Sequence, residues 1–190
     1  MTVKILGGQF KGRLLFTPQS GLTRPTSSIL RKAIFDICRQ DVQGSHFLDL
    51  FGGSGAIGLE AISEGADHVS FIDNSMEAIN CIKKNVDLLN VKRQVDIYRG
   101  DALKILKKLE DSQKKFHIVY LDPPYKDRSL IRDIFFILEN SSLVLDQGLI
   151  FVESHHLPNE SLCFGTDSLK LVDERRFASS ILQKYIKING

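Results

Sequence analysis

Asp49-Leu50-Phe51-Gly52-Gly53-Ser54-Gly55-Ala56-Ile57-Gly58 is the stretch that decides the fold of this chain. It continues an apolar run that starts at residue 47 and leads directly into a helical pattern. A glycine-rich turn between a strand and a helix is where doubly wound folds bind nucleotides, because glycine lets the backbone approach a ligand closely. Three of its glycines satisfy the dinucleotide-binding fingerprint. We therefore expect a nucleotide-like ligand at this turn.

Short apolar runs alternate with amphipathic helical patterns from residue 46 to residue 138. This alternation indicates βαβ units and a parallel, doubly wound sheet, so the expected fold class is α/β. The tail has strands with little helix between them, and antiparallel strands should close one edge. We predict strands at 47–51, 69–72, 95–98, 118–121, 149–153, 168–174 and 181–188, and helices at 56–63, 76–89, 102–109 and 130–138.

A basic segment precedes this pattern. Strand-like runs at 3–7 and 13–17 predict a β-hairpin that projects Phe10, Lys11 and Arg13. Residues 18–25 then read as a loop.

A helical pattern with Thr26 as its N-cap follows this loop and carries Arg31 on its polar side. Residues 1–40 hold seven basic residues against a single acid, Asp36, whereas the whole chain has a net charge of only +2. Such an asymmetry is expected of a segment that meets a polyanion, although a merely soluble basic face would look the same. If the polyanion is a nucleic acid, we predict that Lys11, Arg13, Arg24 and Arg31 contact its phosphates.

The composition of the 190-residue chain fits one globular unit with a full core. No apolar stretch is long enough to span a membrane, and the N-terminus lacks a signal-peptide pattern, so we expect a cytoplasmic protein. Cys38, Cys81 and Cys163 are too widely spaced for a disulfide framework or a metal site, and we expect buried or half-buried thiols. Neighbouring His155 and His156 point to opposite sides of a strand, so no metal is expected.

Acidic residues follow the first three strands of the predicted sheet. The Asp49 carboxylate could pair with a cationic ammonium group. The Asp73 carboxylate could accept hydrogen bonds from ribose hydroxyls, and the Asp101 carboxylate could accept one from an adenine amine. Together these are the functional groups of S-adenosylmethionine, although an NAD-binding site remains an alternative and Asp73 and Asp101 could simply cap helices. The predicted cofactor-binding residues are Asp49, Phe51, Gly52, Gly53, Ser54, Gly55, Asp73, Asn74, Asp101 and Ala102.

The fourth strand runs into Asp122-Pro123-Pro124-Tyr125, which we predict to be the catalytic motif. Two prolines fix the backbone and leave no amide donors, so the motif offers acceptors to an NH2 group. An aromatic amine needs such acceptors, because its lone pair is spread into the ring and must be localised before nitrogen attacks a methyl group. Tyr125 is expected to stack on the base.

With both motifs in this order, the chain resembles the RsmD-type methyltransferases, which methylate the N2 amine of a guanine in bacterial small-subunit (16S) ribosomal RNA. The chain departs from the family pattern at three places. Gly52 replaces alanine, Asp73 replaces glutamate, and Phe177-Ala178-Ser179 replaces an aromatic-glycine pair. The resemblance rests on Ile5-Leu6-Gly7-Gly8, Lys11-Gly12-Arg13, Arg24-Pro25-Thr26, Leu30-Arg31, Ile34-Phe35, the glycine stretch, Leu59-Glu60-Ala61, Asp122-Pro123-Pro124-Tyr125 and Phe151-Val152-Glu153-Ser154.

The resemblance implies a Rossmann-like class I S-adenosylmethionine-dependent methyltransferase, with a mainly parallel seven-stranded sheet and an N-terminal β-hairpin extension. It further implies that the enzyme acts on RNA within an assembling ribosomal particle. We expect a monomer in which residues 1–40 dock RNA and residues 41–190 form the methyltransferase domain. The alternatives are another amino-methyltransferase acting on adenine N6 in DNA or RNA, an NAD-dependent oxidoreductase, and a non-catalytic RNA-binding assembly factor.

Overall fold

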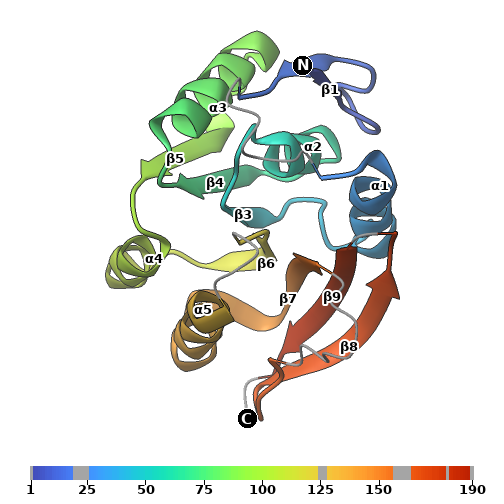
Figure 1. The fold of residues 1–190 in the computed structure, drawn as a ribbon. Coiled ribbons are helices and arrows are strands. Elements are labelled where there is room, and N and C mark those ends of the chain that lie inside the picture. Colours follow the sequence, from blue (N-terminus) through green and yellow to red (C-terminus); the bar gives the residue numbers. More distant parts are fainter. Residues whose placement is uncertain (1, 19–25, 124–127, 156–163, 179, 189–190) are drawn as a thin grey trace.

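The computed structural model describes residues 2–18, 26–123, 128–155, 164–178 and 180–188 (Figure 1). A seven-stranded sheet forms the centre, in the order β5-β4-β3-β6-β7-β9-β8. The first five strands in this order run parallel, and β9 runs antiparallel to both of its neighbours. The strands are β3 (His46–Leu50), β4 (His68–Asp73), β5 (Val95–Arg99), β6 (Phe116–Leu121), β7 (Val144–His155), β8 (Leu169–Arg176) and β9 (Ser180–Lys187). The predicted sheet, with its antiparallel edge, is therefore confirmed.

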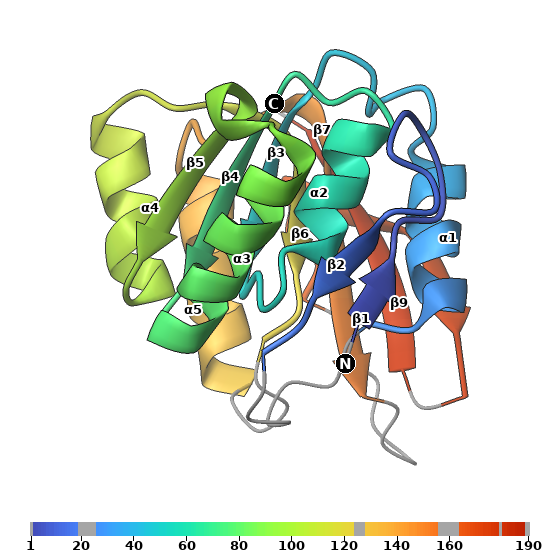
Figure 2. The ribbon, with the colours of Figure 1, turned by 90° about the horizontal axis from the view of Figure 1, so that it is seen from above.

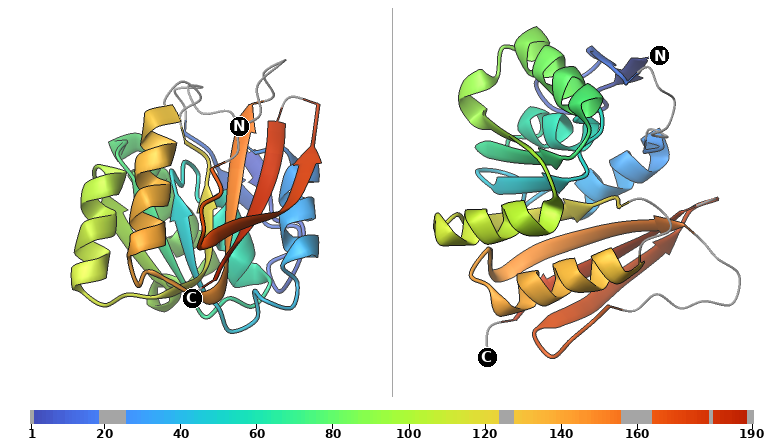
Figure 3. Two further views of the ribbon diagram at one scale, coloured as in Figure 1. Left: turned by 90° about the horizontal axis from the view of Figure 1, so that it is seen from below. Right: turned by 60° about the vertical axis from the view of Figure 1, so that its left-hand side comes forward.

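Helices cover both faces of this sheet and give three layers (Figures 1 and 3). On one face α1 (Ser28–Ile37), α2 (Ala56–Ser63) and α3 (Met76–Leu89) share a buried apolar cluster with the sheet. On the other face α4 (Ala102–Asp111) and α5 (Arg128–Asn140) bury a second cluster. None of the helices in the described ranges is long and apolar enough to cross a membrane.

The helix boundaries follow from local side-chain chemistry. Ser75 caps α3, since its hydroxyl accepts from the Ala78 N–H at 3.3 Å, and Asn90 ends the helix in the left-handed conformation with φ of 62°. Such ends are typical, because short polar side chains satisfy free N–H groups and asparagine tolerates positive φ. Both cap residues lie within one residue of the predicted helix bounds. Periodicity and capping thus specify this element locally.

Two predicted boundaries at the N-terminal helix and the tail are wrong. Ser27, not Thr26, caps α1, because the Ser27 hydroxyl accepts from the Leu30 N–H while Thr26 Oγ1 lies 3.4 Å from Tyr120 Oη. Strand β7 begins at Val144 rather than at residue 149. The polar residues between these positions form an irregularity within the strand, where Gln147 has φ of 59° and the register with β6 shifts.

The N-terminal hairpin has shorter strands than predicted, β1 (Thr2–Lys4) and β2 (Leu14–Phe16). The residues between them dock on α2 instead of continuing as strands. Leu6 and Gly7 donate their backbone N–H groups to Glu60 Oε1 at 2.6 and 2.9 Å. Phe10 is also not projected, since its ring packs against the core and its N–H bonds Ser63 Oγ. Figure 2 shows the hairpin alongside α2 and α3.

Candidate active site

Asp49 is the penultimate residue of β3, just before the glycine turn. Its side chain is 1% exposed, and Oδ2 accepts from the Gly58 N–H in α2 at 3.0 Å. Gly58 is required there, because a Cβ would collide with the Phe71 ring on β4. Burial raises the pKa of Asp49 to about 7, the bond from Gly58 opposes the rise, and the charge of Asp73 adds to it. Such an acid favours a cationic ligand beside it.

Asp73 joins the glycine turn to the end of β4. Its Oδ2 accepts from the Gly53 N–H at 2.9 Å and its Oδ1 from the Ser75 N–H at 2.8 Å. The alternative that Asp73 caps α3 is wrong, because Ser75 fills that position. The carboxylate is 9% exposed and lies next to exposed Asn74 at the same edge of the sheet.

The glycine turn itself adopts conformations that ordinary residues avoid. Gly53 and Gly55 have φ of 56° and 77°, and Phe51 is left-handed as well, with φ of 66°. Non-glycine residues with positive φ are uncommon and cluster at ligand sites. Ser54 lies between the two glycines, and its carbonyl accepts from Asn85 Nδ2 of α3 at 2.9 Å. The turn is therefore held from β4 and α3 at once.

Asp101 and Ala102 lie where β5 leads into α4. Asp101 is exposed and caps this helix, since Oδ1 accepts from the Lys104 N–H at 3.0 Å. The capping role is therefore confirmed, and contact with a ligand stays a prediction. Because β3, β4 and β5 are parallel neighbours, Asp49, Asp73 and Asp101 all lie at the carboxyl edge of the sheet, where open α/β folds bind ligands.

Asp122 and Pro123 follow β6, which pairs with β3 up to Leu121 opposite Leu50. This register brings the Asp-Pro segment next to the glycine turn. The pKa of Asp122 is raised well above its usual range, first by burial and then by the charges of Glu153 and Asp49. Pro124 and Tyr125 lie outside the described residues.

Glu153, for which no role was predicted from sequence, is 4% exposed near the end of β7. Tyr120 Oη donates to Glu153 Oε2 at 2.7 Å, and Ser180 Oγ donates to Oε1 at 3.0 Å. The only available signal was an acid at the end of an apolar strand. That pattern cannot reveal the two hydroxyl donors, because they come from neighbouring strands.

Arg31 was predicted to contact RNA, and the structure contradicts this. Its side chain is 3% exposed, with Nη1 2.7 Å from Glu60 Oε2 and Nη2 donating to the Lys4 carbonyl at 3.0 Å. The Arg31 guanidinium therefore links α1 to both β1 and α2 and is not available to RNA. Lys11 and Arg13 are exposed, and Arg13 Nη2 donates to the Leu88 carbonyl at 3.1 Å. Arg24 lies outside the described residues.

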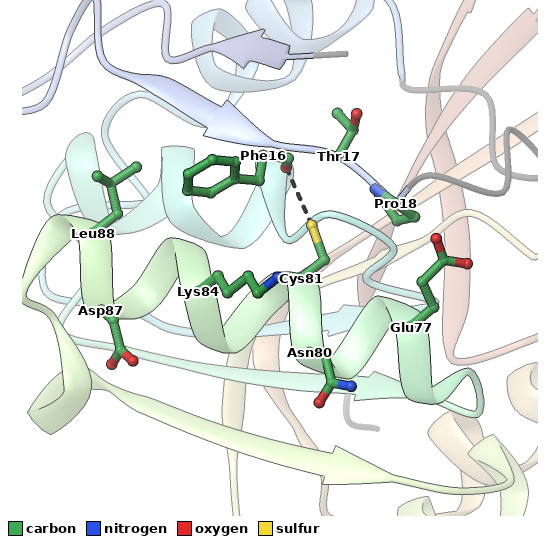
Figure 4. Close-up of a pocket in the computed structure, with 9 residues that line it drawn as sticks. All are labelled: Phe16, Thr17, Pro18, Glu77, Asn80, Cys81, Lys84, Asp87 and Leu88. Atoms are coloured by element: carbon green, nitrogen blue, oxygen red, sulfur yellow. Dashed lines mark hydrogen bonds between the residues drawn. The ribbon is translucent and has the colours of Figure 1, made fainter.

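A pocket of about 820 Å³ lies between β2 and α3 (Figure 4). Half of the Phe16 side chain is exposed there, and the Cys81 thiol donates to the Phe16 carbonyl at 3.2 Å. The pocket includes none of the predicted cofactor residues. Its described lining consists of Phe16, Thr17, Pro18, Glu77, Asn80, Cys81, Lys84, Asp87 and Leu88.

Two of the three predicted thiols lie among the described residues. Cys38 and Cys81 are free and buried, as expected, and Cys163 lies outside the described residues. Burial raises the pKa of the Cys38 thiol to about 12, so it is unreactive at neutral pH. Within the described part of the chain, no group of three or more His, Cys, Asp or Glu side chains could hold a metal ion.

Comparison with known proteins places this site in a family. Residues 3–186 match the family model described as conserved hypothetical protein 95. The ribosomal RNA small subunit methyltransferase D of Escherichia coli is 32% identical over 154 residues, which cover 80% of this chain and 74% of that protein. The enzyme of the same name from Haemophilus influenzae is 32% identical over 153 residues, covering 80% and 78%.

A solved structure from Escherichia coli, described as methyltransferase yhhF, has a TM-score of 0.86 with 26% identity and covers 99% of both chains. The agreement thus extends over the N-terminal hairpin as well as the sheet. The chain belongs to the conserved hypothetical protein 95 family, which is the family of the RsmD-type methyltransferases.

Proposed function

We propose that this protein transfers a methyl group from S-adenosylmethionine to the exocyclic N2 amine of a guanine in small-subunit ribosomal RNA. The observation that carries the proposal is the meeting of two motifs at one edge of the sheet. Asp49 near the end of β3 and Asp73 at the end of β4 bond backbone N–H groups at the glycine turn and the helix after it, and Asp122 with Pro123 follows the adjacent strand β6. The methyltransferase relatives, named for ribosomal RNA, support the same reaction.

The residues at the glycine turn fit this cofactor. Asp49 is buried and, within the described residues, forms no ion pair, so a cationic ligand group would relieve its unfavourable burial. Asp73 offers carboxylate acceptors to ribose hydroxyls, and Asp101 is exposed where the adenine amine is expected. When bound, S-adenosylmethionine supplies an electrophilic methyl group on a sulfonium.

Asp122 and the Pro123 carbonyl are expected to accept hydrogen bonds from the guanine NH2. These contacts orient the nitrogen lone pair toward the methyl group, and holding reacting atoms in line can contribute roughly 7 kcal/mol or more. Deprotonation in advance is unnecessary, because the amine becomes acidic only as methyl transfer proceeds. The guanine has to be unpaired or flipped out to reach this edge, at an unstacking cost of about a few kcal/mol.

RNA docking is assigned to residues 1–40, and the remaining chain is assigned to methyl transfer. Lys11 and Arg13 are exposed on the hairpin, and Arg13 donates to the carbonyl of Leu88, which lines the pocket. In that pocket Phe16 offers an aromatic face and Lys84 a positive charge (Figure 4). Cations beside an exposed ring suit single-stranded RNA, since phosphates meet the charges and bases stack on the ring. We further propose a cytoplasmic monomer that acts on a partly assembled ribosomal particle.

Methylation of small-subunit particles with radiolabelled S-adenosylmethionine tests the proposed reaction. We expect label in N2-methylguanosine with the wild-type protein. Asp122→Ala should abolish turnover and leave cofactor affinity within a few-fold of the wild-type value, because Asp122 is expected to bind the substrate amine rather than the cofactor. Asp133→Ala, which removes an exposed acid on α5, serves as the control. Label in adenine, or in DNA instead of RNA, would favour the other amino-methyltransferase reaction, and retained single-turnover rate in Asp122→Ala would refute the assigned role.

A further inference from the structure

Glu153 is a buried acid among the apolar residues of β7, where an apolar side chain would be expected from packing alone. It follows Val152, which lies opposite Leu121 in the parallel pair of β7 and β6, so Glu153 is next to Asp122. Glu153 is 4% exposed, and Asp122 is half-buried at the same edge of the sheet. Placing two carboxylates side by side with little access to solvent opposes folding, since each disfavours the charge of the other. Such pairs are characteristic of functional sites.

The Glu153 carboxylate is also held in a fixed orientation. The Tyr120 and Ser180 hydroxyls, from β6 and β9, donate to its two different oxygens at 2.7 and 3.0 Å. Tyr120 is fully buried and precedes Asp122 by two residues, while Thr26 lies 3.4 Å from the Tyr120 hydroxyl. Within the described residues no lysine or arginine forms an ion pair with Glu153.

We propose that Glu153 is a positioning residue that acts through Asp122 and makes Asp122 the acceptor of the proton released by the methylated amine. The inference rests on the proposed methyl transfer. In that step the nitrogen–carbon bond forms as the carbon–sulfur bond breaks, and the sulfonium becomes a neutral thioether. The nitrogen becomes positively charged, passes one proton to an Asp122 oxygen, and Asp122 later releases that proton to water.

The electrostatics of the site support this role. The pKa of Asp122 is raised by burial, then by Glu153 and then by Asp49 on β3. Of the other groups on elements packed here, Tyr120 is engaged with Glu153, and Arg31 on α1 is paired with Glu60. A carboxylate with a raised pKa takes up a proton more readily than an exposed aspartate, and a base is most effective when its pKa lies near the working pH.

Replacing Glu153 by glutamine removes the charge and keeps the size of the side chain. We expect the protonated carboxyl of Asp122, seen by infrared spectroscopy of the protein without cofactor, to titrate at a pH lower by about one unit or more. Asp122→Asn identifies the band by removing it. In single-turnover assays, the rate of Glu153→Gln should be about tenfold lower than that of the wild type at neutral pH. The acid side of its pH–rate profile should move to lower pH.

Ser154→Ala is the matched control, since it changes a buried neighbour on the same strand. It should leave both the infrared titration and the pH–rate profile unchanged. A folded Glu153→Gln protein with the wild-type Asp122 titration would overturn the inference, and lower stability without a shifted titration would make Glu153 merely structural. The infrared measurement needs no methyl transfer. Failure of the wild-type protein to methylate RNA would therefore count against the proposed function and leave this test standing.

Discussion

At the scale of single residues, the site is built from acids whose surroundings differ. Asp49 is buried with one backbone donor, Asp73 receives two, and Asp101 is exposed at a helix cap. Asp49 opposes folding when charged, whereas a charged ligand group beside it would reverse that effect.

This difference predicts how stability depends on pH. The pKa of Asp49 is about 7 in the folded protein, above its value in the unfolded chain, so the native state binds the extra proton between about pH 4 and pH 7. The wild-type free energy of unfolding should therefore fall as pH rises through this window, by about 4 kcal/mol at most at about 1.36 kcal/mol per unit. Asp49→Asn should lose this dependence.

Thermal unfolding of the cofactor-free protein at pH 5 and pH 8 measures the effect. The advantage of Asp49→Asn over wild type should grow toward pH 8, and its affinity for S-adenosylmethionine should fall. Asp133→Asn, which neutralises an exposed acid on α5, is the control and should follow the wild type. Parallel stability curves for Asp49→Asn and wild type would show that burial does not disfavour the Asp49 charge.

At the scale of elements, the N-terminal hairpin is fastened to α2 by polar contacts. Glu60 accepts from the Leu6 and Gly7 N–H groups and pairs with Arg31, which also holds the Lys4 carbonyl. Burial lowers the pKa of Arg31 and raises that of Glu60, so each residue needs the other. Loss of one partner would leave an uncompensated buried charge.

Arg31→Ala should therefore reduce the free energy of unfolding by about 3 to 5 kcal/mol. Lys32→Ala, an exposed change on the same helix, should stay within about 0.5 kcal/mol of wild type. Chemical denaturation gives both values, and hydrogen exchange at Leu6 and Gly7 should accelerate in Arg31→Ala. Equal stability of the two variants would contradict a fastening role for the ion pair.

The same element shows what sequence can predict. Alternating strands and helices, the glycine turn and most bounds follow from local periodicity and capping, and the structure agrees with them. The burial of Arg31 did not follow, because its partner Glu60 is 29 residues away and a helical pattern alone places arginine on the polar side. The fixed orientation of Glu153 could not be predicted for the same reason, since its hydrogen-bond donors come from β6 and β9.

At the scale of the whole molecule, charge is unevenly distributed. The N-terminal 40 residues are strongly basic although the chain carries a net charge of +2. With Arg31 buried, the exposed candidates among the described residues are Lys11 and Arg13 on the hairpin. The predicted cofactor-binding residues lie at the carboxyl edge of the central sheet and on the glycine turn. RNA docking and cofactor binding should therefore be separable.

Lys11→Glu/Arg13→Glu should weaken RNA binding and leave S-adenosylmethionine affinity unchanged. Each lost phosphate contact should reduce the slope of log affinity against log salt by about 0.7 to 0.9, so the deficit should be largest at low salt. Lys107→Glu/Lys108→Glu, an equal charge reversal on exposed residues of α4, is the control and should have a smaller effect. Wild-type RNA affinity in the hairpin variant would exclude the hairpin as the docking element.

The central claim is that the two motifs at the carboxyl edge of the sheet methylate guanine N2 in small-subunit ribosomal RNA. Mass mapping of methylated nucleotides in ribosomal RNA, from cells with and without this protein, tests it most directly. We predict one N2-methylguanosine in the small-subunit RNA that disappears when the protein is absent and returns with the wild-type gene but not with Asp122→Ala. An unchanged methylation map, or loss of a methyl group from another base, would contradict the claim.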